Sequence, residues 1–413
     1  MSWRETTLGE ITDLKRGFDL PKSQRLQGDV PVYSSSGITG SNSTAAVEGP
    51  CVITGRCGTI GEVFFSGGPC WPLNTALYST EFNGNNPRFI YYLLQTIPWQ
   101  GYTTASAVPG VNRNHVNLCP VKIPDRATQD AIVEVLDSIV DKIALNNRLN
   151  DYLLELVSSV FAYRFSNNVN TTELKNVLSI STKALKPQEH AGEIWEHYSI
   201  PAFDENHRPV FEPASGIKSN KYQIDSECIL ISKLNPSTKR IWMPYCSSNN
   251  AVCSTEFIVY RPYLKEYKSF YYAAIDSPRF TDYLLEHVSG STGSRQRAQS
   301  KDTLNYLMPN PGKEEIKDFC TFADPIYRHI QINEQQTAKL ELLRDALLPK
   351  LMSGEIDVSK VDLTQLTNNH LAGRMHWSTV IRVRAIHAVH SRQSQIPAYE
   401  SVPRVLHSHA TPP

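Results

Sequence analysis

The chain contains two copies of one pattern, and this repeat limits its possible folds more than any other feature. Shifting the sequence so that Asp137 falls on Asp324 superposes two long helical patterns without a gap. The other matched pairs include Ile139 with Ile326, Ile143 with Ile330, Asn146 with Asn333, and Leu153 with Leu340. Pro124 and Pro311 stand just before the two patterns. The chain is therefore expected to fold as two similar units.

The segments before the two helical patterns also resemble each other in the same order. CVITGR at 51–56 resembles CILISK at 228–233, and NTALY at 74–78 resembles STEFI at 254–258. FIYYLL at 89–94 falls in the same frame as SFYYAA at 269–274, and TTLGEI at 6–11 matches TTELKNVL at 171–178. The separation between matched segments increases from the start of the chain towards the long helices. Loop insertions produce such a drift, so the pattern indicates a duplicated domain.

Each copy is predicted to be a mixed α/β domain followed by one long helix, which makes the fold class α+β. Short β-branched or aromatic runs, such as VPVY, CVITG, EVFF, CILIS and EFIVY, are bounded by Gly, Pro, Asn and Ser. One helix is expected at 87–96, with a counterpart at 268–288. The predicted parts are a first domain at 1–125, a long helix at 126–166, a second domain at 167–312, a second long helix at 313–354 and a tail at 355–413.

The two long helices carry an apolar seam with alternating spacings of four and three residues, which is typical of a coiled coil. The first seam is Ile132, Leu136, Ile139, Ile143, Asn146, Asn150, Leu153, Val157 and Val160. The second is Phe319, Ala323, Ile326, Ile330, Asn333, Thr337, Leu340 and Leu347, with Arg344 as an exception. A helix packed only on its own domain is the alternative. A helix of about 40 residues, roughly 60 Å long, favours antiparallel pairing of the two helices.

Asn146 and Asn150 interrupt the first seam where Leu or Ile is expected. Asn333 occupies the place of Asn146 in the second copy. If the helices pair about a pseudo-twofold axis, Asn146 and Asn333 are expected to face each other and to fix the register at a cost in stability. The alternative is that both side chains reach solvent. Asn150, whose repeat partner is Thr337, is given no symmetric role.

The composition describes an ordinary water-soluble protein without a predicted membrane span. Hydrophobic residues make up 40%, charged residues 20%, and the formal net charge is zero, so any basic surface must be local. The N-terminus lacks the apolar core of a signal peptide, and a cytoplasmic location is expected. None of the eight cysteines forms a CxxC pair, so buried free thiols are expected rather than a zinc site.

Residues 364–413 differ from the rest of the chain. Five arginines, namely Arg374, Arg382, Arg384, Arg392 and Arg404, stand against one acid, Glu400. No sustained apolar period is present. An unstructured appendage is predicted, and a basic arm that contacts nucleic acid is the alternative.

Known catalytic motifs are missing from the sequence. There is no GxxxxGK[ST] phosphate loop, GxSxG elbow, HExxH helix or HxE…PCxxC deaminase pattern. The strings NNPRF and LNPST lack the second proline of the Asn/Asp-Pro-Pro-aromatic motif of amino-methyltransferases. GRCGTIG at 55–61 has the wrong spacing for a dinucleotide loop and precedes a strand-like run, so a tight turn between two strands is predicted.

Polar loops with DNA-binding side chains recur before both long helices. GVNRNHVN at 110–117 contains Asn112, Arg113 and Asn114, and GSTGSRQRAQSKD at 290–302 contains Ser291, Arg295 and Arg297. SKLNPSTKR at 232–240 adds Lys233, Lys239 and Arg240. Such side chains contact phosphates and base edges. The alternative for each residue is a solvated loop position. Because similar loops recur at equivalent points of both copies, a DNA-binding role is favoured for the loops as sets.

These features together resemble the specificity (S) subunits of type I restriction–modification systems. The resemblance covers about residues 1–360 and depends on LGEI near the start, GRCGTIG followed by LNTALY, RFIYYLL, IPDRATQDAIVEVLDSIVDKIALNN, and LELLRDALLPKLMSGEIDV at 340–358. Through it, Arg56, Thr59 and Asn74 join the candidate DNA-binding positions. The second junction, MPNPGKEEIKDFC, lacks the Pro-x4-Gln arrangement of Pro124 and Gln129, and the tail has no counterpart in the family pattern.

The resemblance implies a non-catalytic subunit that binds a bipartite DNA target, with one half read by each domain and the helices as a spacer. Two modification subunits would dock on it and methylate adenine with S-adenosylmethionine, and restriction subunits would add ATP- and Mg-dependent cleavage. No cofactor is expected on this chain. Half-sites one DNA turn apart are about 34–36 Å from centre to centre, which a helix of about 60 Å can span.

Two other functions compete with DNA recognition. A duplicated protein–protein scaffold without a nucleic-acid role would show no DNA binding with or without partners. A stand-alone enzyme that acts on DNA would transfer methyl groups without a partner subunit.

Overall fold

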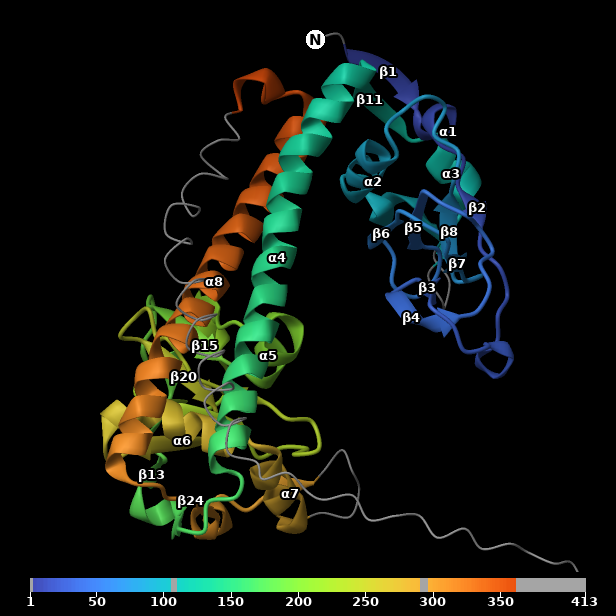
Figure 1. Ribbon diagram of the computed structural model, residues 1–413. Helices are drawn as coiled ribbons and strands as arrows, with labels where there is room; N and C mark the ends of the chain where they lie inside the picture. Colours follow the sequence, from blue (N-terminus) through green and yellow to red (C-terminus); the bar gives the residue numbers. More distant parts are fainter. Residues whose placement is uncertain (1–2, 105–109, 290–295, 362–413) are drawn as a thin grey trace, which may run out of the picture. The chain divides into compact units, whose positions relative to one another are not determined.

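The computed structural model describes residues 3–104, 110–289 and 296–361 (Figure 1). The chain forms two compact units: unit 1 consists of Met1–Ser138 and Leu348–Pro413, and unit 2 of Ile139–Leu347. Residues 362–413, which hold most of the predicted tail, lie outside the described residues. Residues 355–361 of that tail are folded, because they contain the 3-10 turn η9 (Val358–Lys360) with Val358 buried.

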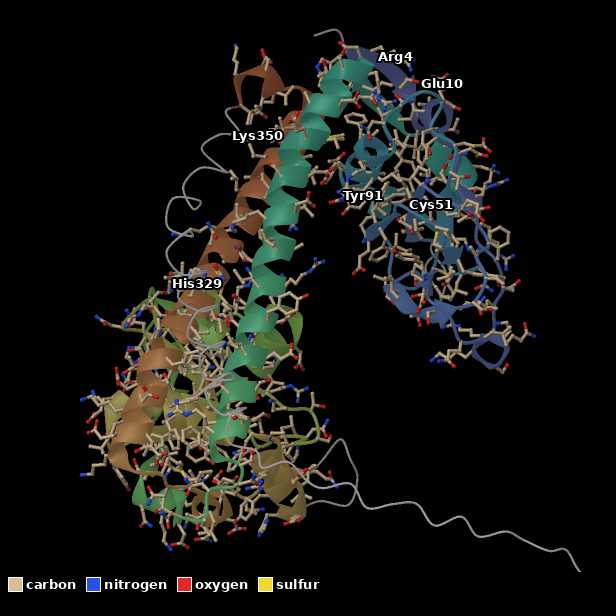
Figure 2. The ribbon with its side chains drawn as sticks, in the orientation of Figure 1. Arg4, Glu10, Cys51, Tyr91, His329 and Lys350 are labelled. Carbon is tan, nitrogen blue, oxygen red and sulfur yellow. The ribbon has the colours of Figure 1, made fainter. Side chains whose placement is uncertain are left out.

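Unit 1 is rich in short strands, as the β-branched and aromatic runs predict. Its elements before the first long helix are β1 (Trp3–Thr7), α1 (Leu8–Ile11), β2 (Lys15–Arg16), η1 (Lys22–Gln24), β3 (Val30–Ser34), β4 (Gly37–Asn42), β5 (Cys51–Gly55), β6 (Val63–Ser66), β7 (Trp71–Pro72), β8 (Ala76–Ser79), α2 (Pro87–Gln95), η2 (Trp99–Tyr102), β9 (Thr103–Thr104), β10 (Gly110–Val111), α3 (Arg113–Asn117) and β11 (Pro120–Pro124). Cys51 begins the fully buried strand β5 (Figure 2).

Unit 2 repeats this order of strands with insertions. Between the two long helices lie β12 (Thr171–Glu173), η3 (Leu174–Asn176), β13 (Leu178–Ser181), β14 (Ala184–Leu185), η4 (Pro187–Glu189), β15 (Ile194–Tyr198), α5 (Ile200–Asn206), β16 (Val210–Pro213), η5 (Ala214–Gly216), β17 (Lys221–Gln223), β18 (Ile229–Ser232), β19 (Ile241–Trp242), β20 (Ala251–Ser254), β21 (Phe257–Pro262), η6 (Lys265–Tyr267), α6 (Lys268–Ile275), α7 (Pro278–Glu286), β22 (Val288–Ser289), β23 (Arg297–Ala298), η8 (Asp302–Asn305) and β24 (Leu307–Pro309).

The sheet topology of unit 1 recurs in unit 2, which adds two strands. The order β2-β8-β5-β6 in unit 1 matches β13-β21-β18-β19 in unit 2, and the pair β1-β11 matches β12-β24. The sheet β4-β3-β7 matches β16-β15-β20, which β17 and β14 extend at one edge. Even the parallel pairing recurs, between β3 and β7 and between β15 and β20. The predicted repeat of two mixed α/β domains is therefore confirmed.

The strand registers refine the predicted alignment of the copies. Gly55 pairs with Ala76, and its counterpart Ser232 pairs with Phe257. The structure thus matches Ala76 with Phe257, whereas the sequence comparison matched Ala76 with Glu256, the preceding residue. A one-residue slip moves every side chain of a strand to the opposite face, so the buried face fixes the alignment where sequence similarity is weak.

The expected helix at 268–288 is wrong, because the structure has two helices there. α6 ends at Ile275, and α7 begins at Pro278 with Ser277 as its N-cap, where the Ser277 hydroxyl accepts a hydrogen bond from the backbone N–H of Phe280. Proline disfavours helical geometry in the residue before it and supplies no N–H. The Ser-Pro pair therefore ends one helix and starts the next.

The two long helices are α4 (Arg126–Phe165) and α8 (Lys313–Ser353), close to the predicted limits. Within unit 2 they run side by side and antiparallel (Figure 1). Contacts that involve later residues of α4 involve earlier residues of α8, as antiparallel packing requires. Phe161 lies 5.6 Å from Phe319 between ring centroids, and Asn333 Nδ2 lies 2.8 Å from Asn150 Oδ1. The predicted antiparallel pair is confirmed.

The polar seam residues are buried between the helices of unit 2, but not in the predicted pairs. Asn146 Nδ2 donates to Thr337 Oγ1 at 3.3 Å, and Asn333 donates to Asn150. Because Asn146 matches Asn333 and Asn150 matches Thr337 in the repeat, the two pairs exchange under the pseudo-twofold axis. The expected Asn146–Asn333 contact is therefore wrong. The axis passes between the pairs, so Asn150, which was given no symmetric role, belongs to the symmetric layer.

Further hydrogen bonds stabilise this polar layer. Asn146 Nδ2 also lies 3.1 Å from Gln336 Oε1, and Asn150 Nδ2 lies 3.4 Å from the carbonyl oxygen of Ile330. Asn146 itself is fully buried. A buried amide that loses its partners costs about 1–3 kcal/mol, so any other register is penalised at this layer.

An aromatic cluster closes unit 2 at the end of α4. Phe161 and Phe165 of α4, Phe270 of α6 and Phe319 of α8 lie 5.2–5.8 Å apart between ring centroids. Rings at these distances add about 0.5–1.5 kcal/mol per pair beyond their buried area. The domain core of unit 2 and its helix pair are thus one continuous core.

Gly354 follows α8 with φ +77°, in the left-handed region. The indole of Trp3 lies within 2.8 Å of where a Cβ would stand. Both the backbone conformation and this contact require glycine.

Within the described residues, no helix has both the length and the apolar character needed to cross a bilayer. The eight cysteines are all free thiols, and six of them are buried.

Glu334 of α8 is largely buried against the loop that follows α5, with 11% of its side chain exposed. His207 Nδ1 lies 3.5 Å from Glu334 Oε1, and the His207 ring stacks on Trp242. Burial raises the pKa of Glu334 to about 8, although the positive charge of Arg208 opposes this shift. Burial also lowers the pKa of His207. Further along α8, Arg208 Nη2 lies 2.7 Å from Glu341 Oε2.

The raised pKa of Glu334 makes the stability of unit 2 depend on pH. The folded state holds this proton up to about pH 8, whereas the unfolded chain releases it near 4.5. The contribution is therefore complete below pH 4.5 and is lost as pH rises towards 8, with a slope of at most about 1.4 kcal/mol per pH unit. We expect Glu334→Gln to remove this slope in urea unfolding measured between pH 5 and 8.

Glu314→Gln, at an exposed position of the same helix, is the matched control and should unfold like the wild type. His207 contributes in the opposite direction below its ordinary pKa of 6.5, so the comparison is between the variants at each pH. Identical slopes for wild type and Glu334→Gln would contradict the prediction.

Candidate nucleic-acid interface

The loop at 56–62 joins β5 to β6 in unit 1. The two strands are antiparallel neighbours, with Thr54 opposite Val63, so the predicted tight turn is confirmed. The turn closes over Gly55, where a Cβ would stand 1.7 Å from the carbonyl oxygen of Thr59. Gly58 and Gly61 have φ of +83° and +94°. Only glycine allows this close backbone approach, and the turn thereby holds Arg56 and Thr59 at the end of the sheet.

Arg56 joins three segments of unit 1 that are distant in sequence. Its backbone N–H donates to the carbonyl of Thr75 at 2.9 Å, and its carbonyl accepts from the N–H of Val111 at 2.8 Å. Its side-chain Nε donates to the carbonyl of Asn74 at 3.0 Å. The structure therefore brings Arg56, Thr59 and Asn74 next to the segment that precedes α3.

Unit 2 repeats this arrangement around Lys233. The backbone N–H of Lys233 donates to the carbonyl of Glu256, and its carbonyl accepts from the N–H of Ala298, both at 2.9 Å. Leu234 forms an isolated bridge with Arg297, as its counterpart Cys57 does with Gly110. The backbone bonds are equivalent residue for residue. The loops that sequence analysis selected therefore form one matching cluster in each unit, which we call the loop cluster.

The loop cluster of unit 1 consists of 56–62, 72–75 and 110–114, and that of unit 2 of 232–240, 254–256 and 296–298. Asn112 caps α3 by accepting a hydrogen bond from the N–H of Asn114 at 3.0 Å. Asn112, Arg113 and Asn114 are exposed. Ser291 and Arg295 lie outside the described residues.

Lys239 and Arg240 in unit 2 are held by carboxylates of neighbouring helices. Arg240 makes a two-pronged contact with Asp204 of α5, with N–O distances of 2.5 and 2.8 Å. Lys239 Nζ lies 2.6 Å from Asp276 Oδ1 at the end of α6. Bidentate arginine pairs are geometrically demanding, so these contacts fix the path of the 232–240 loop.

Two further predicted side chains also have internal partners. Arg297 Nε lies 3.1 Å from Glu256 Oε2, and the side-chain amide of Asn74 donates to Asp19. A side chain that must exchange an internal partner for DNA gains less from the contact than a free one. The predicted contacts of Lys239, Arg240 and Arg297 with DNA stay predictions.

The acidic partners affect the local electrostatics. Hydrogen bonding to Arg240 lowers the pKa of Asp204. Burial raises the pKa of Asp276, and Lys239 opposes that shift. Hydrogen bonding to Glu256 raises the pKa of Arg297. The loop cluster of unit 2 therefore carries compensated charge rather than a strong basic field.

Sequence analysis missed Asp204, Asp276 and Glu256, which set the charge of the loop cluster. Nothing in their spacing marks them. Asp204 is 36 residues from Arg240, and Asp276 is 37 residues from Lys239. Each acid reaches its cation only because the domain folds so that distant segments of the chain become neighbours.

Among the described residues, no group of three or more His, Cys, Asp or Glu side chains is placed to bind a metal ion.

The sequence matches a protein-family model over its first part. Residues 1–155 match the family described as the type I restriction modification DNA specificity domain. No curated protein matches the chain.

A solved structure shares the fold over most of the chain. The crystal structure of the type I restriction-modification system S subunit from M. genitalium has 15% sequence identity and a TM-score of 0.55, and the match covers 85% of this chain and 96% of that one. The HsdS subunit from Thermoanaerobacter tengcongensis has 16% identity, a TM-score of 0.30, and coverage of 86% and 97%. The resemblance predicted from the motifs is confirmed by the family model at 1–155 and by the fold.

The contacts of Asp204 generate a prediction about the 232–240 loop. If Arg240 shapes the loop rather than binding a phosphate, Asp204→Asn should lower the ratio of specific to random-DNA affinity about tenfold, or ~1.4 kcal/mol. The dependence of affinity on salt should stay unchanged, since no phosphate contact is lost. Binding of both DNAs over a salt series measures both quantities.

Asp225→Asn is the matched control. Asp225 forms a similar ion pair with Arg261, 2.8 Å apart, at the end of the β18–β21 strand pair that is farther from the loop cluster. It should leave the affinity ratio intact. A fall of about one in the salt slope for Arg240→Ala would instead assign Arg240 to a phosphate.

Proposed function

We propose that this chain, which carries a type I restriction-modification DNA specificity domain at residues 1–155, is the sequence-recognition subunit of such a system. Each unit binds one half of a bipartite DNA target through its loop cluster. The observation that supports this most directly is the duplicated backbone geometry around Arg56 and Lys233. Two equivalent loop clusters in one chain suit a target made of two half-sites.

The partners are those that the resemblance to specificity subunits implies. Modification subunits supply S-adenosylmethionine and methylate adenine, and restriction subunits supply ATP- and Mg-dependent cleavage. This chain itself performs no catalysis and selects the site. Its cellular location is the cytoplasm, where the DNA is.

The function is tested by mapping adenine methylation in cells with and without this gene. A bipartite methylated motif that disappears with the gene supports the proposal. Methylation that persists unchanged would contradict it, and methyl transfer by the purified chain alone would point to an enzyme.

DNA affinity provides a second test. With zero formal net charge and with Arg240 and Arg297 paired to acids in the loop cluster of unit 2, the free chain should bind DNA weakly, because phosphate contacts supply much of the affinity. We expect a steeper salt dependence once modification subunits are bound, since they add phosphate contacts. Equal salt slopes for the free chain and the assembled complex would refute this expectation.

The polar layer between the helices generates a prediction about target spacing. Replacing Asn150 and Asn333 by Leu removes one hydrogen-bonded pair together, so the variant should be at least as stable as the wild type. It should also tolerate alternative registers. A slip of one heptad moves a helix by roughly 10 Å, or about three base pairs.

The measurement is binding to targets whose spacer differs by up to about three base pairs, the shift expected from one heptad. Wild type should prefer one spacer, and the double variant should discriminate less. Leu153→Ile, a conservative change in the same seam, is the control. Undiminished spacer preference in the double variant would show that the layer does not set the spacing.

A further inference from the structure

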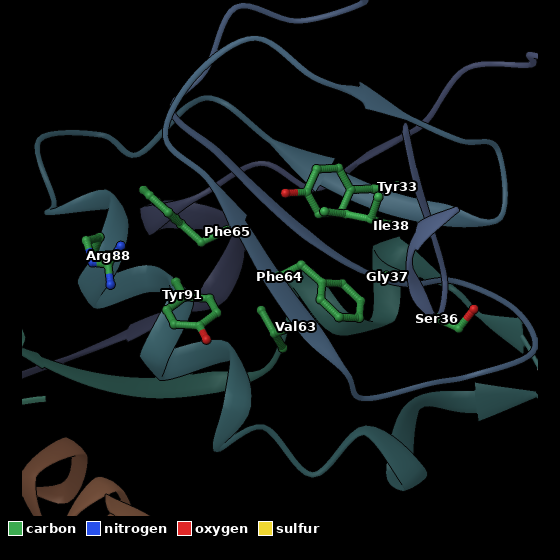
Figure 3. Close-up of a pocket in the computed structure, with 9 residues that line it drawn as sticks. All are labelled: Tyr33, Ser36, Gly37, Ile38, Val63, Phe64, Phe65, Arg88 and Tyr91. Atoms are coloured by element: carbon green, nitrogen blue, oxygen red, sulfur yellow. The ribbon is translucent and has the colours of Figure 1, made fainter. Parts of the chain in front are cut away.

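Unit 1 has a concave surface, lined largely by aromatic side chains, that the proposed DNA contacts do not use. Its volume is about 550 Å³, and strands β3, β4 and β6 form it together with helix α2 (Figure 3). Tyr33, Phe64 and Tyr91 supply its aromatic wall, and Ile38 stands at its rim with 63% of its surface exposed. We call it the aromatic recess.

The internal duplication identifies the counterpart of this recess in unit 2. Phe64 of β6 lies opposite Ile53 of β5. Trp242 of β19 lies opposite Leu230 of β18, which is the counterpart of Ile53 in the repeat. Tyr33 pairs with Pro72 where β3 runs parallel to β7. Tyr198 pairs with Cys253 at the equivalent position, where β15 runs parallel to β20. The same ring pair recurs, with centroids 6.2 Å apart for Tyr33–Phe64 and 4.8 Å for Tyr198–Trp242.

In unit 2 this surface is covered by helices. Phe203 of α5 lies 5.2 Å from Trp242, and His207, one helical turn later, lies 5.4 Å from it and stacks on it. On the other side Tyr327 of α8 lies 5.0 Å from Tyr272, the counterpart of Tyr91 in the alignment set by the strand registers. The surface therefore accepts a helix that carries an aromatic side chain and a second flat ring one turn later.

Unit 1 lacks the segment that fills this place. In unit 2 the chain from Ser199 to Pro209 builds α5 between β15 and β16, whereas in unit 1 only Ser35 and Ser36 separate β3 from β4. Among the described residues of unit 1, no helix takes the position of α5. Within the described residues of unit 1, the recess thus corresponds to a surface that α5 covers in unit 2.

The charge of the recess excludes DNA as its ligand. Arg88 is the one cation among its described lining residues. Its Nε lies 2.6 Å from Asp137 Oδ2, and its guanidinium lies over the Phe65 ring, 5.0 Å from the centroid. A phosphate backbone requires cations that are available to it, whereas a concave wall of aromatic rings suits an aromatic anchor of a protein helix.

We propose that the aromatic recess is the docking site for a helix of a modification subunit. That helix presents an aromatic side chain towards Phe64 and Tyr33, as Phe203 does towards Trp242 in unit 2. This inference rests on the proposed function, which supplies the partner. It adds a contact on the recognition domain itself, next to the loop cluster, because Val63 of the recess directly follows the 56–62 loop.

The test measures binding of the purified full-length chain to the modification subunit of its own system by sedimentation or calorimetry. Ile38→Asp should weaken this binding at least tenfold, because it places a charge at the rim of the recess without disturbing the core. Leu26→Asp, which is similarly exposed at 66% in the same unit but does not line the recess, should bind like the wild type.

A second variant covers the recess with the α5 segment of unit 2. Replacing Ser35–Ser36 by Ile200–Pro209 should block the modification subunit while the chain stays folded, as shown by its thermal unfolding. Unchanged binding by Ile38→Asp and by this graft would overturn the inference. Equal weakening by Leu26→Asp would also overturn it, as a general effect of charge.

A photoreactive phenylalanine at Tyr91 identifies the occupant. Crosslinks to the modification subunit support the proposal, and crosslinks to DNA, to a second copy or to another part of this chain overturn it. If the wild-type chain binds no modification subunit at all, the proposed function fails instead, so the two failures are distinct.

Discussion

The register of the antiparallel helix pair in unit 2 is the constraint on which the proposed function depends. Asn146 with Thr337 and Asn150 with Asn333 form a buried polar layer whose two pairs exchange about a pseudo-twofold axis. Apolar seam residues pack nearly as well after a shift of one heptad, but buried amides do not keep their hydrogen bonds. Under the proposed function the layer fixes a single alignment, which a subunit that binds two separated half-sites has to hold constant.

The same duplication serves two different purposes in the loop clusters and in the aromatic recess. Around Arg56 and Lys233 the backbone is kept residue for residue, which holds the loops in the same frame while their side chains differ. Around Phe64 and Trp242 the aromatic wall is kept, but only unit 2 has the α5 insertion that covers it. Under the proposed function, the kept backbone frame lets the two units bind different sequences, and the wall without an α5 insertion is where we propose that a partner docks.

Charge compensation within unit 2 explains how a chain with zero formal net charge is organised near its loops. Asp204 and Asp276 engage Arg240 and Lys239, so these cations act first on the conformation of the 232–240 loop. Exposed ion pairs contribute little energy individually. Their effect is geometric, because a guanidinium held by two oxygens fixes the direction of the backbone that carries it.

The repeat, the two long helices, the turn at GRCGTIG and the place of the candidate loops were all predictable from the order of residues. These features depend on periodicity and on local turn chemistry, which act over a few residues. The folded chain was needed to show that Asn146 meets Thr337 rather than Asn333, that the helix after Lys268 breaks at Ser277, and that Arg240 is held by Asp204. The pairing across two helices depends on where the symmetry axis falls between side chains, and an ion pair depends on which distant segments the sheets bring together. The order of residues along the chain carries neither position, since both arise only when separate parts of the chain pack against each other.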